Sequence, residues 1–237
     1  MNAIDKRRIE KMMEDSIMEM PIGFEVGERH FFLYPVTLGR AYLISREREG
    51  MADNLRQIFA ESTESERIDY RRSICRIVAI QTMKSKDEIF DISALNSRIE
   101  YLYANLDDDG LFCLYDMILD SMEDSKMFIK NCGLEHDKKA LAKIAKHKED
   151  GGNISFGGKT AYGSFISVAC EKYGWTIDYV VWGISLTNLE MLLADAPTSV
   201  YLTKDERKTL KISTDRTFID AGDPANVERI KQIISGN

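Results

Sequence analysis

The most chemically suggestive spacing in the chain lies between residues 105 and 116. Asn105, Asp107, Asp109 and Asp116 stand where the first, third, fifth and twelfth positions of an EF-hand calcium loop would be. The usual loop begins with aspartate and ends with a bidentate glutamate, whereas here the first ligand is an amide and the twelfth is one methylene shorter. Alternatively, Asp108 and Asp109 cap the following helix and favour its dipole. The segment therefore predicts either a single calcium site or the start of a helix.

A second suggestive step is the glycine, lysine and threonine at positions 158–160, which resembles the end of a nucleotide-binding P-loop. That loop requires a glycine five positions before its last glycine, so that backbone amides can wrap a phosphate. Asn153 stands at this position, and the residues before it do not read as a buried strand. We therefore interpret the step as a turn that enters a helix.

No other spacing in the chain indicates catalysis. The three histidines are scattered, and none has the helix-spaced partner of a zinc-protease motif. No Gly-x-Ser-x-Gly elbow occurs, and the four cysteines are too far apart in sequence for a zinc knuckle or a redox pair. We expect a protein that is not an enzyme and needs no cofactor.

One basic stretch could contact nucleic acid. Acidic residues bracket it and no aromatic residues interleave for base stacking, so a solvated helix face is the simpler interpretation. The net charge of -7 also argues against a general affinity for phosphates. A DNA-binding regulator stays open only through this stretch, which comprises Lys138, Lys139, Lys143, Lys146, His147 and Lys148.

The composition is that of a helical globular protein. Of the 237 residues, 44% are hydrophobic and 30% are charged, and only 4 are proline. The first residues are charged and lack the apolar core of a signal peptide, and no apolar run approaches the ~20 residues of a membrane span. We expect a cytoplasmic protein with reduced cysteines and no membrane contact.

Hydrophobic periodicity predicts a mainly α fold. A short amphipathic helix over 3–20 is followed by a β-hairpin in which 24–26 and 30–34 flank the turn at 27–29. Thr37 can cap the next helix, and helix after helix follows from about residue 52 to 149. The sequence therefore predicts a multi-helical body with a small N-terminal hairpin.

The glycine-rich stretch from Gly151 to Gly158 is the best candidate for a linker. It divides the chain into a helical domain at 1–150 and a smaller C-terminal helical module at 159–237. Within the module, a second short strand pairing is expected around Lys211–Ile219.

The C-terminal module contains an unusual concentration of large aromatic side chains around two short helices, which Thr176 and Ser185 can cap. Most buried aromatic residues belong to a core, but exposed Trp and Tyr rings are natural anchors for a partner. We predict that one aromatic cluster links the two helices and that at least one ring stays partly exposed. Its members are Tyr173, Trp175, Tyr179, Trp182 and Leu186.

Two parts of the chain carry a resemblance to a known family. The C-terminal part reads Tyr173-Gly174-Trp175-Thr176-Ile177-Asp178-Tyr179-Val180 and then Ser185-Leu186-Thr187-Asn188-Leu189. It resembles phage and prophage tail assembly chaperones, in which a Gly-Trp-Thr or Gly-Trp-Ser step opens a short helix and a leucine-rich helix follows. The hairpin followed by Pro35-Val36-Thr37-Leu38-Gly39 is similar to the entry into their helical body.

The resemblance implies a protein of the host cytoplasm that coats the tape-measure protein and recruits tail-tube subunits, without catalytic residues. A homo-oligomer is also open. An acidic protein with grooves for apolar helix side chains suits this role, and the 11 methionines can adapt to varied partners or simply fill the core. A calcium-responsive helical binding protein and a DNA-binding regulator remain the alternatives.

Overall fold

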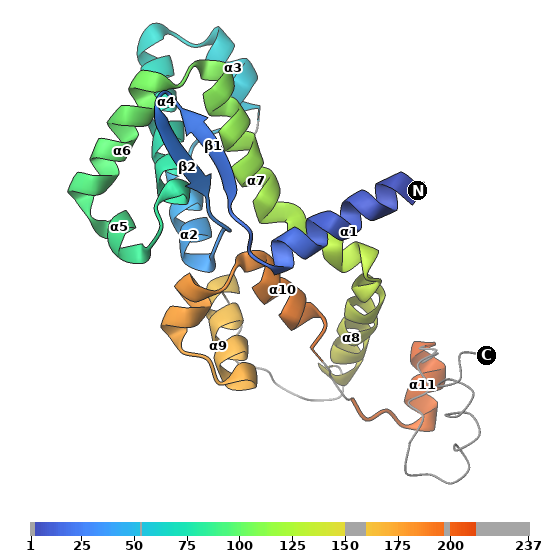
Figure 1. The fold of residues 1–237 in the computed structure, drawn as a ribbon. Coiled ribbons are helices and arrows are strands. Elements are labelled where there is room, and N and C mark those ends of the chain that lie inside the picture. The colour runs from blue at the N-terminus through green and yellow to red at the C-terminus, as the bar shows by residue number, and fades with distance from the viewer. Residues whose placement is uncertain (1–2, 53, 150–159, 197–199, 212–237) are drawn as a thin grey trace. The chain divides into compact units, whose positions relative to one another are not determined.

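The computed structural model describes residues 3–52, 54–149, 160–196 and 200–211 (Figure 1). The chain divides into two compact units, one of residues 1–138 and 154–197 and one of residues 139–153 and 198–237. This division differs from the predicted one, because 160–196 belong with the N-terminal residues. The predicted linker at 151–158 lies outside the described residues, as does the predicted pairing around 211–219 apart from Lys211, which ends the last described helix.

The fold is mainly α with an N-terminal hairpin, as predicted. The strands are β1 (Ile22–Val26) and β2 (Arg29–Leu33). The helices of the first half are α1 (Ala3–Ile17), α2 (Leu38–Glu47), α3 (Leu55–Glu61), α4 (Glu64–Thr82), α5 (Lys86–Phe90) and α6 (Ile92–Asn105). The later ones are α7 (Asp108–Asn131), α8 (Leu134–Glu149), α9 (Ala161–Tyr173), the π-helix η1 (Tyr179–Gly183), α10 (Leu186–Ala194) and α11 (Lys204–Leu210).

The hairpin has a simple antiparallel register in which Phe24 lies opposite Phe31. Gly27 takes a left-handed φ of 58° in the turn, a conformation that favours glycine. The turn is one residue shorter than predicted, because Arg29 already belongs to β2. Side chains alternate along β2, so that Phe31 is buried while Phe32 is 40% exposed.

Helix α4 forms the centre of the larger core. A capping box between Thr63 and Glu66 starts it. Its second half carries Ile74, Ile77 and Val78, which are all fully buried and form an apolar stripe. Helices α2, α6 and α7 and strand β2 pack against α4 (Figure 1).

The C-terminal end of α4 is held by a side chain from α2. Arg40 is only 5% exposed, and its guanidinium donates to the carbonyls of Ile80 at 2.6 Å and Met83 at 2.5 Å. The last carbonyls of a helix lack partners within the helix, so these bonds satisfy groups that would otherwise be unpaired. Burial lowers the pKa of Arg40 to about 10.

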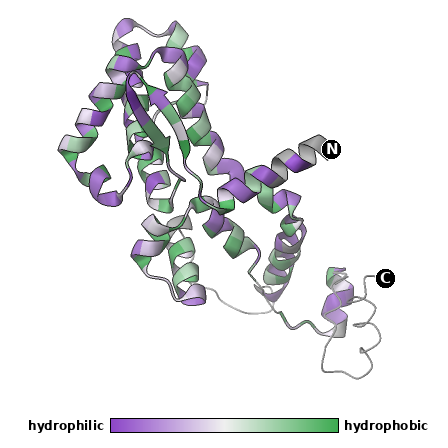
Figure 2. Cartoon of the chain, in the orientation of Figure 1, coloured by the Kyte–Doolittle hydropathy of each residue, from purple (hydrophilic) through white to green (hydrophobic). Residues whose placement is uncertain are grey.

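A second hydrophobic cluster joins α2 to the C-terminal helices of the same unit. Helix α10 is largely hydrophobic, in contrast to the mostly hydrophilic α1 (Figure 2). Ser185 caps α10 by accepting from the amide of Asn188 at 3.2 Å, as predicted. The buried members of the cluster are Val36, Leu38, Ala41, Ala169, Val180, Ile184, Leu186 and Leu189.

The second unit is described for the C-terminal part of α8 and for residues 200–211. A capping box starts α11: the amide of Thr203 donates to Glu206 at 2.6 Å, and Thr203 Oγ1 accepts from the Glu206 amide. These bonds lower the pKa of Glu206. Lys148 of α8 donates to the carbonyl of Tyr201 at 2.9 Å.

Candidate functional site

Three of the five predicted aromatic-module residues form a continuous run of rings, which we call the aromatic run. Tyr173 stacks on Trp175 with ring centroids 4.7 Å apart, and Trp175 meets the edge of Tyr179 at 5.2 Å. The hydroxyl of Tyr173 donates to the carbonyl of Leu192 at 2.8 Å. Tyr179 is 45% exposed, so this run combines packing with accessible aromatic surface.

The other two predicted residues lie elsewhere. Trp182 packs against the larger core and meets Phe90 of α5 edge-on at 5.7 Å. Its ring also covers Gly39, where an added Cβ would lie 2.7 Å from the ring. Leu186 is buried in the second cluster. The predicted single cluster is therefore divided between one partly exposed run and two core positions.

The two segments that carry the family resemblance meet in the structure. The amide of Leu186 donates to the carbonyl of Val36 at 2.7 Å, and Thr37 forms an antiparallel bridge with Ser185. Gly39 under Trp182 is the close approach that this junction requires. The sequence signalled each segment separately but gave no sign that they would pair.

The four candidate calcium ligands do not converge. Asp107 caps α7 by accepting from the amide of Gly110 at 2.8 Å, and Asp116, about two and a half turns further along that helix, pairs with Arg56 at 2.8 Å. Asn105 donates its amide to the carbonyl of Tyr101 in α6. Asp109 lies in the first turn of α7. Because the helix starts at 108, the segment cannot wrap a cation, and the described residues contain no cluster of three or more metal-ligating side chains of His, Cys, Asp or Glu.

The basic stretch lies along α8. Lys138, Lys139, Lys143 and Lys146 are exposed, and Lys148 bonds to Tyr201. An exposed row of this kind on one helix is typical of a solvated face.

A hollow of about 410 Å³, which we call the methionine groove, lies between α1, the start of β1, α7 and the α10 cap. Its apolar wall is made by Met12, Met20, Ile22, Val36, Met117 and Ile118. Met20 and Ile22 are 59% and 52% exposed, so apolar side chains are open to solvent at this groove. Contiguous exposed apolar surface is common at contact sites, which makes the groove a candidate binding surface.

The methionine groove contains several acceptor oxygens among its polar residues. Gln81 is 1% exposed; its Nε2 donates to the carbonyl of Tyr34, while its Oε1 has no hydrogen-bond partner among the described residues. Burial, and secondarily Asp120, raises the pKa of Asp124. Asp15 and Glu19 also line the groove, and Glu19 accepts from the amide of Ser185 at 2.8 Å. No lysine, arginine or histidine lines the described part of this groove.

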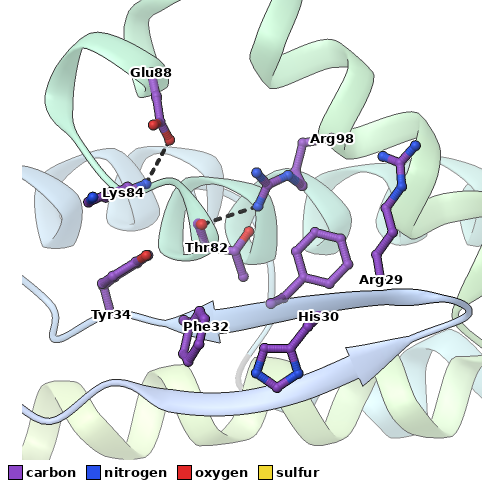
Figure 3. Close-up of a pocket in the computed structure, with 9 residues that line it drawn as sticks. Arg29, His30, Phe32, Tyr34, Thr82, Lys84, Glu88 and Arg98 are labelled. Carbon is purple, nitrogen blue, oxygen red and sulfur yellow. Dashed lines mark hydrogen bonds between the residues drawn. The ribbon is translucent and has the colours of Figure 1, made fainter.

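A second hollow, of about 460 Å³, has the opposite charge and runs beside β2 (Figure 3). We call it the edge pocket. It is lined by consecutive residues of β2 and by Thr82, Lys84, Glu88 and Arg98 from the opposite wall. Arg98 donates to the carbonyl of Thr82 at 3.1 Å and lies over the ring of Phe31 at 4.8 Å. Burial lowers the pKa of Arg98, and the charge of Arg29 lowers it further.

Neither hollow was predicted from the sequence. Gln81 and Asp124 lie within ordinary helical patterns, and only the fold brings them to one groove. The sequence contains a weak indication of the edge pocket, because Arg29, His30 and Phe32 place basic and aromatic side chains beside a tight turn. Arg98 was hidden inside the apolar pattern of α6.

The structure offers one further finding on the helices: in the parts of the chain that it describes, none is both long and apolar enough to cross a membrane. In comparisons with known proteins, no family model, no curated protein and no solved structure matches the chain.

Proposed function

We propose that the protein is a non-enzymatic tail assembly chaperone that holds an apolar helical segment of the tape-measure protein in the methionine groove. The observation that carries the proposal is the groove itself, an open apolar surface next to the junction of the two segments that resemble this family. The resemblance supplies the identity of the partner, and the groove supplies a place for it.

The chemistry of the groove suits a helix with an apolar stripe. Three of its wall residues, Met12, Met20 and Met117, are methionines, whose unbranched side chains adapt to differing partner surfaces. An amphipathic helix binds such a groove through side chains at i, i+3, i+4 and i+7. The acidic residues Asp15 and Asp124 favour lysine or arginine beside that stripe, since complementary charge sets the register of a bound helix.

The aromatic run supplies a second contact surface in this proposal. Tyr179 is exposed on it, and Ile177, which precedes it, is 64% exposed. Large aromatic rings concentrate binding energy at interfaces. We assign this surface to the tail-tube subunit.

The test is co-expression with a fragment of the tape-measure protein from the same phage genome. The wild-type chain should keep the fragment soluble. Met20→Glu should abolish this effect, because a carboxylate in the apolar wall costs several kcal/mol of binding when it is desolvated without a partner. Met20 is 59% exposed, so the variant should fold normally, which a melting curve checks.

A matched control is Met18→Glu. Met18 is 71% exposed and does not line the groove, yet it lies two residues away and the change in charge is the same. Solubility should be retained in this variant. If the wild-type chain leaves the fragment insoluble, or if the two variants behave alike, the groove is not the site and the proposal fails.

A further inference from the structure

The edge pocket follows the unpaired edge of a strand. In the described chain β2 has one neighbour, β1, and an antiparallel strand bonded on one side turns half of its backbone groups to the other side. The pocket is lined by Arg29, His30, Phe31 and Phe32 in succession. Because successive side chains point to opposite faces, only a pocket along the strand's edge touches all four.

The opposite wall of the pocket leaves room beside that edge. Figure 3 shows Thr82, Lys84 and Arg98 on the side of β2 away from β1. Just beyond β2, the amide of Tyr34 donates to the carbonyl of Gln81 at 3.2 Å and closes one end of the edge. The open length is therefore the five residues of β2.

The charge of the pocket is positive in an otherwise acidic protein. Arg29, Lys84 and Arg98 line it against a single carboxylate, Glu88, which accepts from the backbone amide of Lys84 at 2.8 Å. None of the three cations forms an ion pair within the described residues. The charge of Glu88 acts on Arg98, but three cations line the pocket against this one carboxylate, so the pocket keeps a net positive charge.

The open edge and the positive charge of the pocket indicate what kind of segment can bind there. A second copy of β2 would bring another Arg29 to a pocket that already holds Arg29, Lys84 and Arg98, and like charges on an edge oppose such self-pairing. An acidic strand would meet opposite charge instead. Every second side chain of a bound strand would face the rings of His30 and Phe32, which lie 4.8 Å apart. These rings offer a surface for apolar side chains at those positions.

We propose that the edge of β2 binds an extended acidic segment of a partner protein as an added strand, with its carboxylates directed to Arg98 and Lys84. This site is separate from the methionine groove and does not depend on what binds there. Backbone hydrogen bonds to β2 give the affinity, and the cations select acidic sequences.

The experiment uses the full chain and a fluorescein-labelled, end-capped peptide in which glutamate and valine alternate. Fluorescence anisotropy should show saturable binding that weakens with added salt. A peptide with lysine in place of glutamate should not bind. Lys84→Glu should weaken binding roughly five- to tenfold, as expected for reversing one partly exposed charge contact.

Arg98→Gln should weaken binding similarly. Because Arg98 also donates to the carbonyl of Thr82, a melting curve of this variant checks that its fold is intact. Lys84 is exposed and uses only its backbone amide, so its variant is free of that complication. Lys143→Glu is the matched control: it makes the same change of charge at an exposed position in the other unit and should leave binding unchanged. Met20→Glu should also leave it unchanged, which separates this site from the proposed chaperone groove.

Backbone methylation tests the strand geometry. Methylating alternate peptide nitrogens removes the donors on one edge, so one of the two alternating patterns should abolish binding while the other is tolerated. If both methylated peptides bind as well as the parent, the contact is only electrostatic and the proposal is wrong. Equal binding by Lys84→Glu, or displacement of the peptide by an equimolar amount of inorganic phosphate, would overturn it too.

Discussion

Burial shifts the pKa of both Arg40 and Cys75, and both residues lie among packed helices. The pKa of Arg40 falls to about 10 because burial penalises its charge, while two carbonyls of the α4 end hold it in place. The pKa of the Cys75 thiol rises from 9.0 to about 11 for the same reason, since burial penalises the thiolate. Both shifts follow from core packing, and neither residue lines the hollows described above.

Cys75 gives a pH prediction at the residue scale. Its folded pKa of about 11 lies above its unfolded value of 9.0, so the stability it contributes is complete below pH 9 and is lost as pH rises toward 11. Cys75→Ala should therefore show a shallower fall in unfolding free energy than the wild type between those values. Parallel denaturant titrations across that range measure the difference.

Thiol reactivity provides the companion measurement. Cys113 and Cys132 are exposed, whereas Cys75 is buried. Iodoacetamide followed by mass spectrometry should label the two exposed thiols first and Cys75 only on unfolding. Labelling of Cys75 at the rate of Cys113 would contradict the assigned burial.

At the scale of elements, the contact of Gly39 with Trp182 joins α2 to η1. Gly39→Ala would ordinarily favour a helix by about 1 kcal/mol, because alanine is the better helix former. Here the added Cβ meets the Trp182 ring at 2.7 Å, so we expect a net loss of about 1–3 kcal/mol from overpacking. Thermal or denaturant unfolding decides the sign.

A double-mutant cycle with Trp182→Leu tests the cause. If the loss in Gly39→Ala comes from a clash with the Trp182 ring, the double variant should lose less unfolding free energy than the sum of the two single losses. Additive costs would place the effect of Gly39→Ala elsewhere in α2.

The elements also show what the sequence could predict. The hairpin, the caps at Thr37 and Ser185, and the run of helices that includes α4 were all predicted, because each depends on residues close together in the sequence. The bond between Val36 and Leu186 was not, because local periodicity says nothing about which distant faces meet. The helix start at Asp108 decided between the two interpretations of the acidic segment, since a capped helix and a cation loop use the same residues differently.

In the candidate site too, contacts between sequence neighbours could be predicted and contacts between distant elements could not. Tyr173, Trp175 and Tyr179 were expected together because they are near neighbours in sequence, and their rings do form one run. Trp182 was expected with them, but Phe90 and Gly39, from distant elements, hold its ring in another place. The two hollows are assembled entirely from such distant elements.

At the scale of the whole molecule, both hydrophobic clusters belong to the first compact unit. Their members all lie between Phe24 and Leu193. We therefore expect a chain truncated after residue 197 to keep its cooperative unfolding transition and the native fluorescence of its partly buried Trp182. Circular dichroism and fluorescence melts of the truncated and full chains measure this, and loss of the transition would show that 198–237 complete the first core.

The junction of the two distant segments has a consequence for synthesis on the ribosome. The Ser185 amide and the Glu19 carboxylate that it bonds to are 166 positions apart, so the N-terminal partner is made long before its counterpart. Domains form from the N-terminus as the chain emerges, yet the apolar face of α2 cannot be covered until η1 and α10 have been translated. A nascent chain of this protein therefore carries an uncovered hydrophobic patch on α2 until Leu189 has been translated, and we expect a chain that ends before α10 to be a substrate for proteases.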